Sequence, residues 1–190
     1  ALYRPKGFDI IYQIVFKGDA LMKICCIQMN MKLGCPDENF GHAAELIRQA
    51  AANSPDVILL PETWNTGFYP QQGLKDMAQG AAERIKAEIG SLAKKYSINI
   101  IAGSVSDMRD GNVYNTSLVF DRQGQCIASY SKTHLFSPMG ENRHYSPGNS
   151  LCTFELDGVK AGLIICYDIR FPELARSLAL KGMDVLFCVS

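Results

Sequence analysis

The stretch LIICYDIRFPE, residues 163–173, passes from an apolar run into charged residues, an aromatic residue and a proline. The residues just before Cys166, VKAGLII, have the length and β-branched content of a buried strand. After it, leucines at helical spacing, with Pro172 and Glu173 in the first turn, predict a helix. Cys166 therefore lies at a strand-to-helix junction, the edge of a sheet at which α/β proteins bind their ligands.

Two interpretations of Cys166 remain open on this stretch alone. A cysteine behind an apolar run is commonly a small hydrophobic core residue. At a strand end, the positive end of the following helix would favour the thiolate over the thiol, and backbone N–H groups after the cysteine could hold a developing oxyanion. The second interpretation predicts a nucleophile.

Strand-like runs and helical segments alternate outward from this junction. Helices are predicted after residue 35, over about 77–96 and over about 172–182, and loops over 63–76 and 132–150. The predicted strands are residues 23–29, 56–62, 98–105, 113–120, 125–131, 151–156, 159–166 and 184–189. Buried runs and hairpins occur together, so we predict an α/β (α+β layered) domain with a mixed sheet.

The domain is predicted to occupy residues 22–190, since no Pro/Gly/Ser-rich linker divides it. Residues 1–21 precede a Met that opens a clean strand, and their apolar part is too short for a signal peptide. We expect residues 1–21 to be a non-native or disordered extension. Because the chain stops at a strand with no helix after it, we also expect the domain to be incomplete at its C-terminus.

Composition and charge narrow the class of protein. The 190 residues are 47% hydrophobic, and 19 Lys and Arg balance 19 Asp and Glu, so nothing favours a nucleic-acid or membrane partner. No apolar run is long enough to span a membrane. The seven cysteines include no CxxC pair and the three histidines do not cluster with them, so neither a metal site nor a disulfide framework is expected. Free thiols indicate a reducing compartment, most simply the cytoplasm.

Two further residues follow predicted strands. Glu62 ends VILLPE, and Lys132 follows the strand before THLF. Each alone is most simply a solvated charge. Together with Cys166 they form a chemical set: Glu62 could take the thiol proton and return it to a leaving group, and Lys132 could stabilise the negative charge that develops on a carbonyl or nitrile.

The motifs LLPETW, YSKTHLF and CYDIRFPE, in this order, resemble the nitrilase superfamily of carbon–nitrogen hydrolases. The resemblance runs from about residue 22 to residue 190. It implies a Glu62–Lys132–Cys166 triad on an αββα sandwich, two such sandwiches packed as a homodimer, and neither a metal nor an organic cofactor.

The same resemblance assigns further residues. Glu141 matches a second glutamate that positions the lysine and the substrate, and Tyr167 could offer its backbone N–H to the oxyanion while its side chain packs. Asn115, in YNTS, is expected to be a buried amide that bonds neighbouring backbone. Structural contacts are expected for three more residues: Asp168 and Arg170, as a local ion pair or otherwise, and His134.

The loop HLF…ENRHYSPGN and CYDIRFPELAR look most like the amidase branch, and within it the ω-amidases. We therefore expect a hydrolase that cleaves a small non-peptide amide, such as the ω-amide of a 2-oxo acid, through a cysteine thioester. Alternatives are an N-carbamoyl or nitrile hydrolase of the same family, or a catalytically silent fragment. A nucleotide-binding module is not supported, because no GxGxxG or GxxxxGK[ST] follows a strand.

Overall fold

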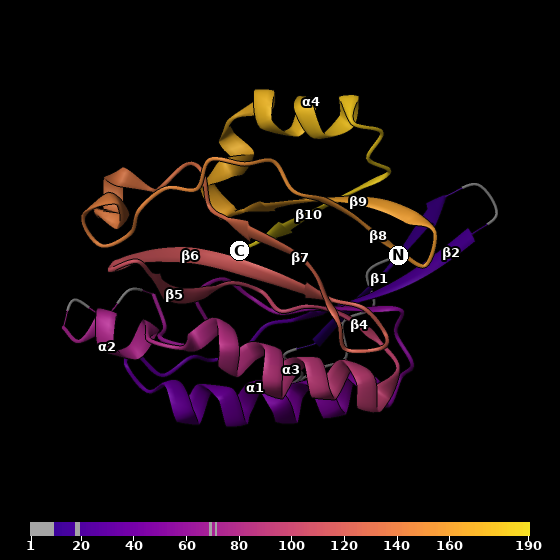
Figure 1. Ribbon diagram of the computed structural model, residues 1–190. Helices are drawn as coiled ribbons and strands as arrows, with labels where there is room; N and C mark the ends of the chain where they lie inside the picture. Colours follow the sequence, from indigo (N-terminus) through magenta and orange to yellow (C-terminus); the bar gives the residue numbers. More distant parts are fainter. Residues whose placement is uncertain (1–9, 18–19, 69, 71) are drawn as a thin grey trace.

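The structure, a computed structural model, describes residues 10–17, 20–68, 70 and 72–190. Figure 1 shows four layers: helices α1 and α3, a large sheet, a small sheet, and helix α4. The two sheets pack face to face, and each is covered on its outer face by helix. The predicted α/β class and the αββα sandwich are thus confirmed.

The large sheet has the order β1-β2-β3-β4-β6, and both β5 and β7 also pair with β6. Strands β2, β3 and β4 run parallel, and the remaining pairs are antiparallel. Its strands are β1 (Ile10–Lys17), β2 (Ala20–Ile27), β3 (Val57–Leu59), β4 (Asn99–Ile101), β5 (Val105–Arg109), β6 (Asn112–Phe120) and β7 (Cys126–Ser131). Strands β3 and β4 have three residues each and are almost wholly buried, as expected for strands covered on both faces.

The small sheet has the order β10-β9-β8, with β9 antiparallel to β8 and parallel to β10. Its strands are β8 (Thr153–Leu156), β9 (Val159–Ile165) and β10 (Val185–Val189), and α4 (Pro172–Leu180) connects β9 to β10. The last five residues of β9 are all buried, because one face meets the large sheet and the other meets α4. This central strand leads directly to Cys166.

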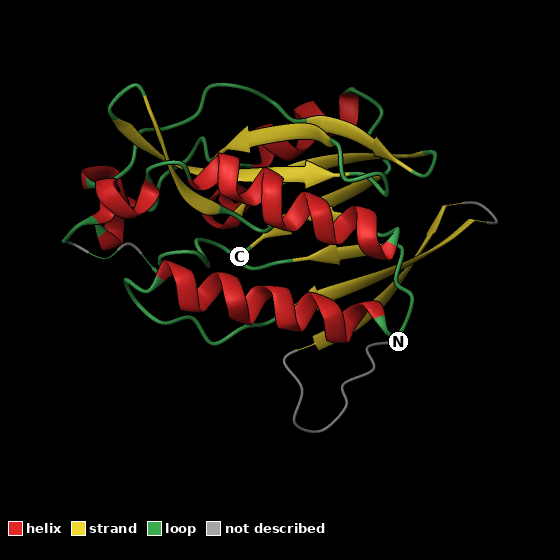
Figure 2. Cartoon of the chain, turned by 60° about the horizontal axis from the view of Figure 1, so that its bottom comes forward, coloured by secondary structure: helices red, strands yellow, loops and turns green. Residues whose placement is uncertain are grey.

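The helices of the opposite layer lie side by side, as Figure 2 shows with this layer turned forward. They are α1 (Pro36–Ala51) and α3 (Ala81–Tyr96), with the short α2 (Leu74–Ala78) before α3. Three 3-10 helices complete the structure: η1 (Ser137–Met139), η2 (Glu141–Arg143) and η3 (Cys166–Arg170). None of the described helices is long and apolar enough to cross a membrane.

Apolar cores between the layers hold them together, and the two larger ones lie on either side of the large sheet. The first lies between α1, α3 and the large sheet, and includes Phe40, Trp64 and Phe120. The second lies between the two sheets, where Val57 and Val119 meet β8, β9 and β10. Burial of this kind contributes about 25 cal/mol per Å² of apolar surface, so the interfaces between layers are the main source of stability.

Two predicted elements are divided in the structure, and each division falls at a glycine with positive φ. The helix predicted over 77–96 begins only at Ala81, because Gly80 has φ +67°, which a right-handed helix cannot include. The strand predicted over 98–105 is split into β4 and β5 by Gly103, with φ +61°. A Cβ on Gly103 would lie 2.1 Å from the Pro61 carbonyl oxygen, so this loop packs directly on the segment before Glu62.

The N-terminal segment is only partly described. Residues 10–17 form β1, which pairs antiparallel with β2. Residues 1–9 and 18–19 lie outside the described residues. That residues 1–21 are a non-native or disordered extension stays a prediction.

Candidate active site

Glu62 is held by the loop that follows β4. It lies three residues after β3 and is 2% exposed. The next residue, Thr63, has φ +47°, an unfavourable conformation for a β-branched side chain. The Thr63 N–H donates to Ser104 Oγ at 3.0 Å, and the Trp64 indole N–H donates to the Ala102 carbonyl at 2.7 Å. These hydrogen bonds fix the path of the chain after β3 and thereby the position of Glu62.

Lys132 lies directly after β7, and its ammonium is completely buried between two carboxylates. Its Nζ is 2.8 Å from Glu62 Oε1 and 2.9 Å from Glu141 Oε2. Burial disfavours the charged ammonium, but the two carboxylates outweigh this effect and hold the pKa of Lys132 above its usual value. The lysine is therefore a fixed cation, as the sequence-based hypothesis requires.

Glu141 belongs to η2 and is as buried as Glu62, with 2% of its surface exposed. Besides Lys132, its Oε2 accepts the backbone N–H of Phe136 at 2.6 Å. Glu141 thus connects the loop after Lys132 back to the lysine itself. This geometry agrees with the predicted positioning role, which the structure alone does not test.

Asn115 differs from the expectation that it bonds neighbouring backbone. Its Nδ2 donates to Glu62 Oε1 at 2.8 Å and to Glu141 Oε1 at 3.1 Å. The cluster has one carboxylate more than it has ammonium groups, and this amide supplies two N–H dipoles to the excess negative charge. Its backbone carbonyl also accepts the Lys132 N–H at 2.9 Å. The available sequence signal was an amide within the predicted strand YNTSLVF.

Cys166 comes from the other sheet, at the end of β9, and is half-buried. It has φ +46°, so both Thr63 next to the glutamate and the cysteine itself adopt left-handed backbone. Such strained positions cluster at functional sites and persist only where surrounding contacts hold them. The Glu62 carboxylate lies close enough to the Cys166 thiol for its charge to act on the thiol, so groups from the two sheets meet at this point.

The electrostatics of the thiol differ from the expectation based on helix polarity. Burial raises the pKa of the Cys166 thiol, and the negative charge of Glu62 raises it further, while a hydrogen bond with Ser190 and the charge of Lys132 act in the opposite direction. The net effect is a raised pKa, so the free protein holds a thiol at neutral pH. Attack by the sulfur therefore needs a base, and the carboxylate whose charge acts on the thiol is Glu62.

Tyr167, Asp168 and His134 lie next to this cluster. The Tyr167 ring packs against Phe136, with ring centroids 4.8 Å apart, as expected for its side chain. Asp168 is fully buried and bonds His134, with Nδ1 and Oδ1 2.9 Å apart. Arg170 is exposed, so the local pair of Asp168 with Arg170 is not found.

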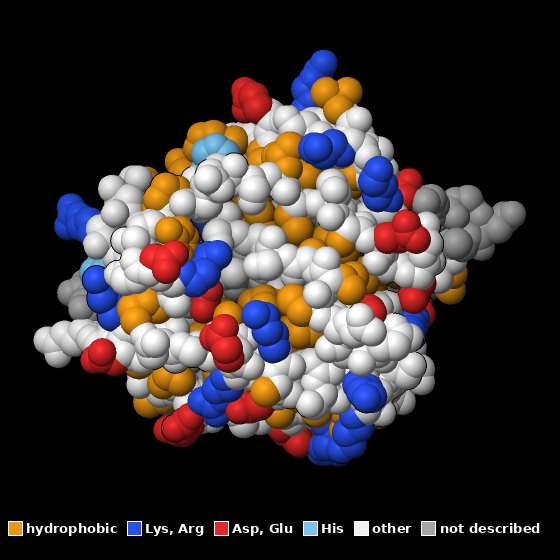
Figure 3. Space-filling model, viewed as in Figure 1, with side chains coloured by type: hydrophobic (Ala, Val, Ile, Leu, Met, Phe, Trp, Pro, Cys, Tyr) orange, Lys and Arg blue, Asp and Glu red, His pale blue; other side chains and the backbone are white. Residues whose placement is uncertain are grey.

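Candidate metal ligands do not cluster in the part of the chain that the structure describes. No three or more of its His, Cys, Asp and Glu side chains gather as ligands for an ion. All seven cysteines, each of which lies in the described part, are free. Positive and negative side chains are interspersed over the face drawn in Figure 3, in line with the balanced composition.

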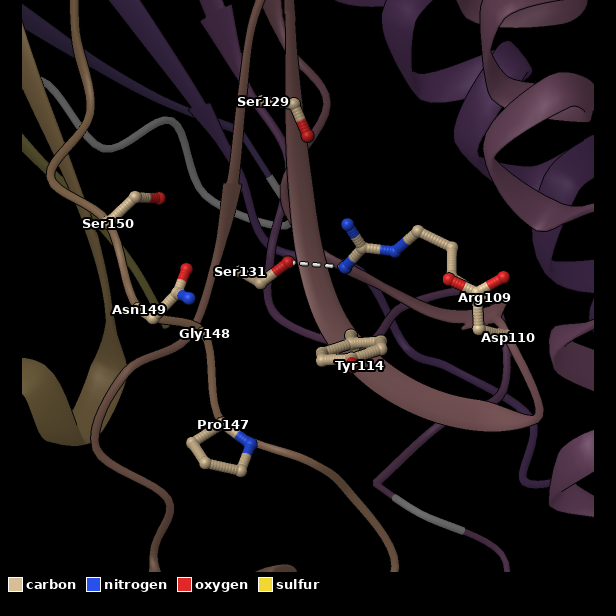
Figure 4. Close-up of a pocket in the computed structure, with 9 residues that line it drawn as sticks. All are labelled: Arg109, Asp110, Tyr114, Ser129, Ser131, Pro147, Gly148, Asn149 and Ser150. Atoms are coloured by element: carbon tan, nitrogen blue, oxygen red, sulfur yellow. Dashed lines mark hydrogen bonds between the residues drawn. The ribbon is translucent and has the colours of Figure 1, made fainter.

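A separate polar pocket of about 260 Å³ opens on the opposite face of β6 and β7 (Figure 4). Side chains alternate along a strand, so Tyr114 and Ser131 point away from the face that carries Asn115 and Lys132. Figure 4 shows the Arg109 guanidinium reaching Ser131, whose Oγ it contacts at 2.5 Å. This pocket contains none of the predicted catalytic residues.

Comparison with known proteins agrees with this arrangement. The family model described as "Carbon-nitrogen hydrolase" matches residues 23–190. The chain belongs to the carbon-nitrogen hydrolase family. It is 41% identical over 164 residues to the 2-oxoglutaramate amidase of Bacillus subtilis, an alignment that covers 86% of this chain and 62% of that protein. It is 36% identical over 160 residues to omega-amidase NIT2 of Danio rerio, covering 78% of this chain and 56% of the relative. This carbon-nitrogen hydrolase thus spans less than two thirds of either curated relative.

Solved structures of the superfamily confirm the fold of this carbon-nitrogen hydrolase. Nit3 of Saccharomyces cerevisiae, a member of the nitrilase superfamily, superimposes with a TM-score of 0.79 at 29% identity. That superposition covers 88% of this chain and 63% of the yeast protein. An amidase of Nesterenkonia sp. gives the same TM-score of 0.79 at 22% identity, over 88% of this chain and 64% of that one. The second likeness bears on the fold alone.

Proposed function

We propose that this protein hydrolyses a small non-peptide amide to a carboxylate and ammonia, with Glu62, Lys132 and Cys166 as its catalytic residues. The observation that supports the proposal most is the Lys132 ammonium, which is buried against the Glu62 carboxylate at 2.8 Å, while the charge of that carboxylate also acts on the Cys166 thiol. A thiol, a base and a fixed cation close to one another are what nucleophilic acyl transfer requires.

In the first half-reaction, Glu62 accepts the thiol proton as Cys166 Sγ forms a bond to the amide carbon. The carbonyl electron pair moves to oxygen, and the Lys132 ammonium, together with the backbone N–H of Tyr167, stabilises the resulting oxyanion. The oxyanion then collapses, the carbon–nitrogen bond breaks, and Glu62 gives its proton to the nitrogen. Ammonia leaves and a thioester on Cys166 remains.

In the second half-reaction, Glu62 takes a proton from water as the water oxygen attacks the thioester carbon. The new oxyanion collapses with cleavage of the carbon–sulfur bond, and the proton returns to the sulfur. The sum is one amide and one water converted to one carboxylic acid and one ammonia. Glu141 and Asn115 act by holding Lys132 and Glu62 in place, since neither needs to exchange a proton.

The substrate we favour is the ω-amide of a 2-oxo acid. Support comes from two relatives, one named 2-oxoglutaramate amidase and one named omega-amidase NIT2. The scheme itself needs no metal or organic cofactor, since Glu62 supplies the proton transfers and Lys132 the positive charge. We further propose a homodimer and a cytoplasmic location, the latter supported by the free cysteines of the described residues.

The test is ammonia release by the full-length protein from a panel of ω-amides of 2-oxo acids, other small amides, N-carbamoyl compounds and nitriles. Cys166→Ala serves as the blank, and Cys152→Ala, which alters a buried cysteine of the inter-sheet core, is the matched control. We expect the 2-oxo acid amides to be hydrolysed fastest, with loss of activity only in Cys166→Ala. Faster ammonia release from nitriles or N-carbamoyl compounds would mean that one of these classes, and not the 2-oxo acid amides, is the substrate. Absence of any turnover would favour the catalytically silent alternative.

A further inference from the structure

Asp168 is a fully buried carboxylate that the proposed chemistry does not use. Its two oxygens accept four hydrogen bonds. Oδ1 accepts the His134 backbone N–H at 2.8 Å and contacts His134 Nδ1 at 2.9 Å. Oδ2 accepts the Tyr130 hydroxyl at 2.8 Å and the Ile165 backbone N–H at 3.0 Å. A carboxylate without water needs such donors, and this one has its acceptor positions filled by three separate residues.

These partners lie around the two parts of the candidate active site. Tyr130 and His134 are two residues before and two residues after Lys132, so Asp168 holds the lysine segment on both sides. Ile165 is the residue directly before Cys166. One side chain therefore joins the segment that ends β7 in the large sheet to the cysteine turn that ends β9 in the small sheet.

The cysteine turn has a physical need for this support. Cys166 has φ +46°, whereas Ile165 is still in extended backbone with φ −122°. A non-glycine residue in the left-handed region is strained and relaxes unless other contacts hold it. The bond from the Ile165 N–H to Asp168 closes the turn across the strained residue.

We propose that Asp168 is the positioning residue that holds the Cys166 turn against the Lys132 segment. The hypothesis rests on the proposed function for its kinetic consequences. Lys132 is fixed to Glu62 by the 2.8 Å ion pair, so the placement of Lys132 relative to Cys166 also sets the distance from the thiol to its base. A shift of about 1 Å in such a geometry costs on the order of 100-fold in rate.

The test compares Asp168→Asn with wild type. An asparagine turns one oxygen into an NH2 group, which then faces N–H donors at either Ile165 or His134, so half of the network is lost. We expect kcat to fall about 10- to 100-fold with a much smaller change in KM, because substrate contacts are untouched. The matched control is Asp157→Asn, since Asp157 bonds Arg122 and Asn99 at the turn before β9, the end of that strand remote from Cys166.

A second pair of variants tests the same hydrogen bond if Asp168→Asn does not fold. His134 is 29% exposed in its side chain, so substitutions there are tolerated better than in the core. His134→Asn keeps an N–H donor at the place of Nδ1, and His134→Ala removes it. We expect His134→Ala to lower kcat and His134→Asn to restore most of it. Equal kcat values in the two variants would contradict a role for this hydrogen bond.

Hydrogen exchange gives a readout that does not depend on any substrate. In Asp168→Asn, exchange should rise together in the peptides that contain Ile165 and His134, two segments joined only through Asp168 in this network. Asp157→Asn should leave both unchanged. Coupled exchange without amide turnover in wild type would overturn the proposed function and keep the positioning role. Unchanged exchange and kcat in Asp168→Asn would overturn the positioning role alone.

Discussion

A cation lies on each face of β6 and β7, and the two cations differ in how much of their side chain is exposed. On the face toward the small sheet, Lys132 is 0% exposed and lies between Glu62 and Glu141. On the other face, the Arg109 side chain is 47% exposed and contacts Asp107 at 3.1 Å. Arg109 comes from β5, and its guanidinium reaches Thr116 and Ser131 on the outer face, so the two cations differ in burial and in the strand that supplies them.

Burial changes what each charge contributes. A buried ion pair gains little net stability by forming, yet removing one partner leaves an uncompensated charge without water. An exposed pair exchanges its partner for solvent at almost no cost. Burial raises the pKa of Asp107 in spite of the nearby Arg109. The attraction to Arg109 therefore does not fully replace the water that this carboxylate loses on burial. We therefore expect substitutions on the two faces to differ strongly in size.

The largest effect is expected for Lys132→Met, which leaves Glu62 and Glu141 facing each other without a cation. The free energy of unfolding should fall by about 3–5 kcal/mol, and activity should be lost. Urea unfolding followed by circular dichroism measures the first, and ammonia release the second. Lys86→Met, at an exposed position of α3, is the control and should unfold as wild type does. A similar loss in both variants would show that burial does not distinguish the two lysines.

The next largest effect is expected for Asn115→Leu. Leucine keeps the shape of the side chain and removes the N–H donors to both glutamates. Leaving these acceptors short of donors should cost about 1–3 kcal/mol of unfolding free energy. Activity should fall as well, because Glu62 loses the contact that orients it. Asn112→Leu, at an exposed position of the same strand, provides the comparison in both measurements. If Asn115→Leu kept wild-type kcat, the amide would have no part in positioning Glu62.

Asn115 also marks how far the sequence alone could lead. The strand-to-helix junction at Cys166 and the order of the three motifs were sufficient to predict the sandwich and the candidate triad. The alternation of side chains along a strand could predict the face on which Asn115 lies. Its hydrogen bonds, however, depend on the positions of Glu62 and Glu141, which belong to distant segments of the chain. Those positions follow from tertiary packing, such as the close approach of Gly103 to Pro61. The raised pKa of the Cys166 thiol was missed for the same reason, because burial and Glu62 outweigh the local helix polarity.

An intermediate effect is expected on the titration of Cys166. Glu62 raises the pKa of this thiol through its charge and its hydrogen bond, whereas Lys132 lowers it. Glu62→Gln should therefore move the midpoint of iodoacetamide labelling to lower pH, while amide hydrolysis is lost. Lys132→Met should move the midpoint to higher pH. Labelling rates of the Cys166 peptide, measured by mass spectrometry from pH 6 to 10, report both shifts. Shifts in the same direction for the two variants would be inconsistent with this charge arrangement.

The smallest effect is expected on the outer face, for Arg109→Gln. The guanidinium stacks over Tyr114, with its carbon 4.3 Å from the ring centroid, and a glutamine keeps much of the aliphatic contact while it loses the charge. Arg109 is 47% exposed, whereas Asp107 is 3% exposed and loses its cation in this variant, so the unfolding free energy should fall by about 1 kcal/mol, well below the loss in Lys132→Met, and kcat should stay at the wild-type value. A loss of kcat in Arg109→Gln without a loss of stability would mean that the two faces are coupled through β6, and that the pocket of Figure 4 contributes to the reaction across the strand.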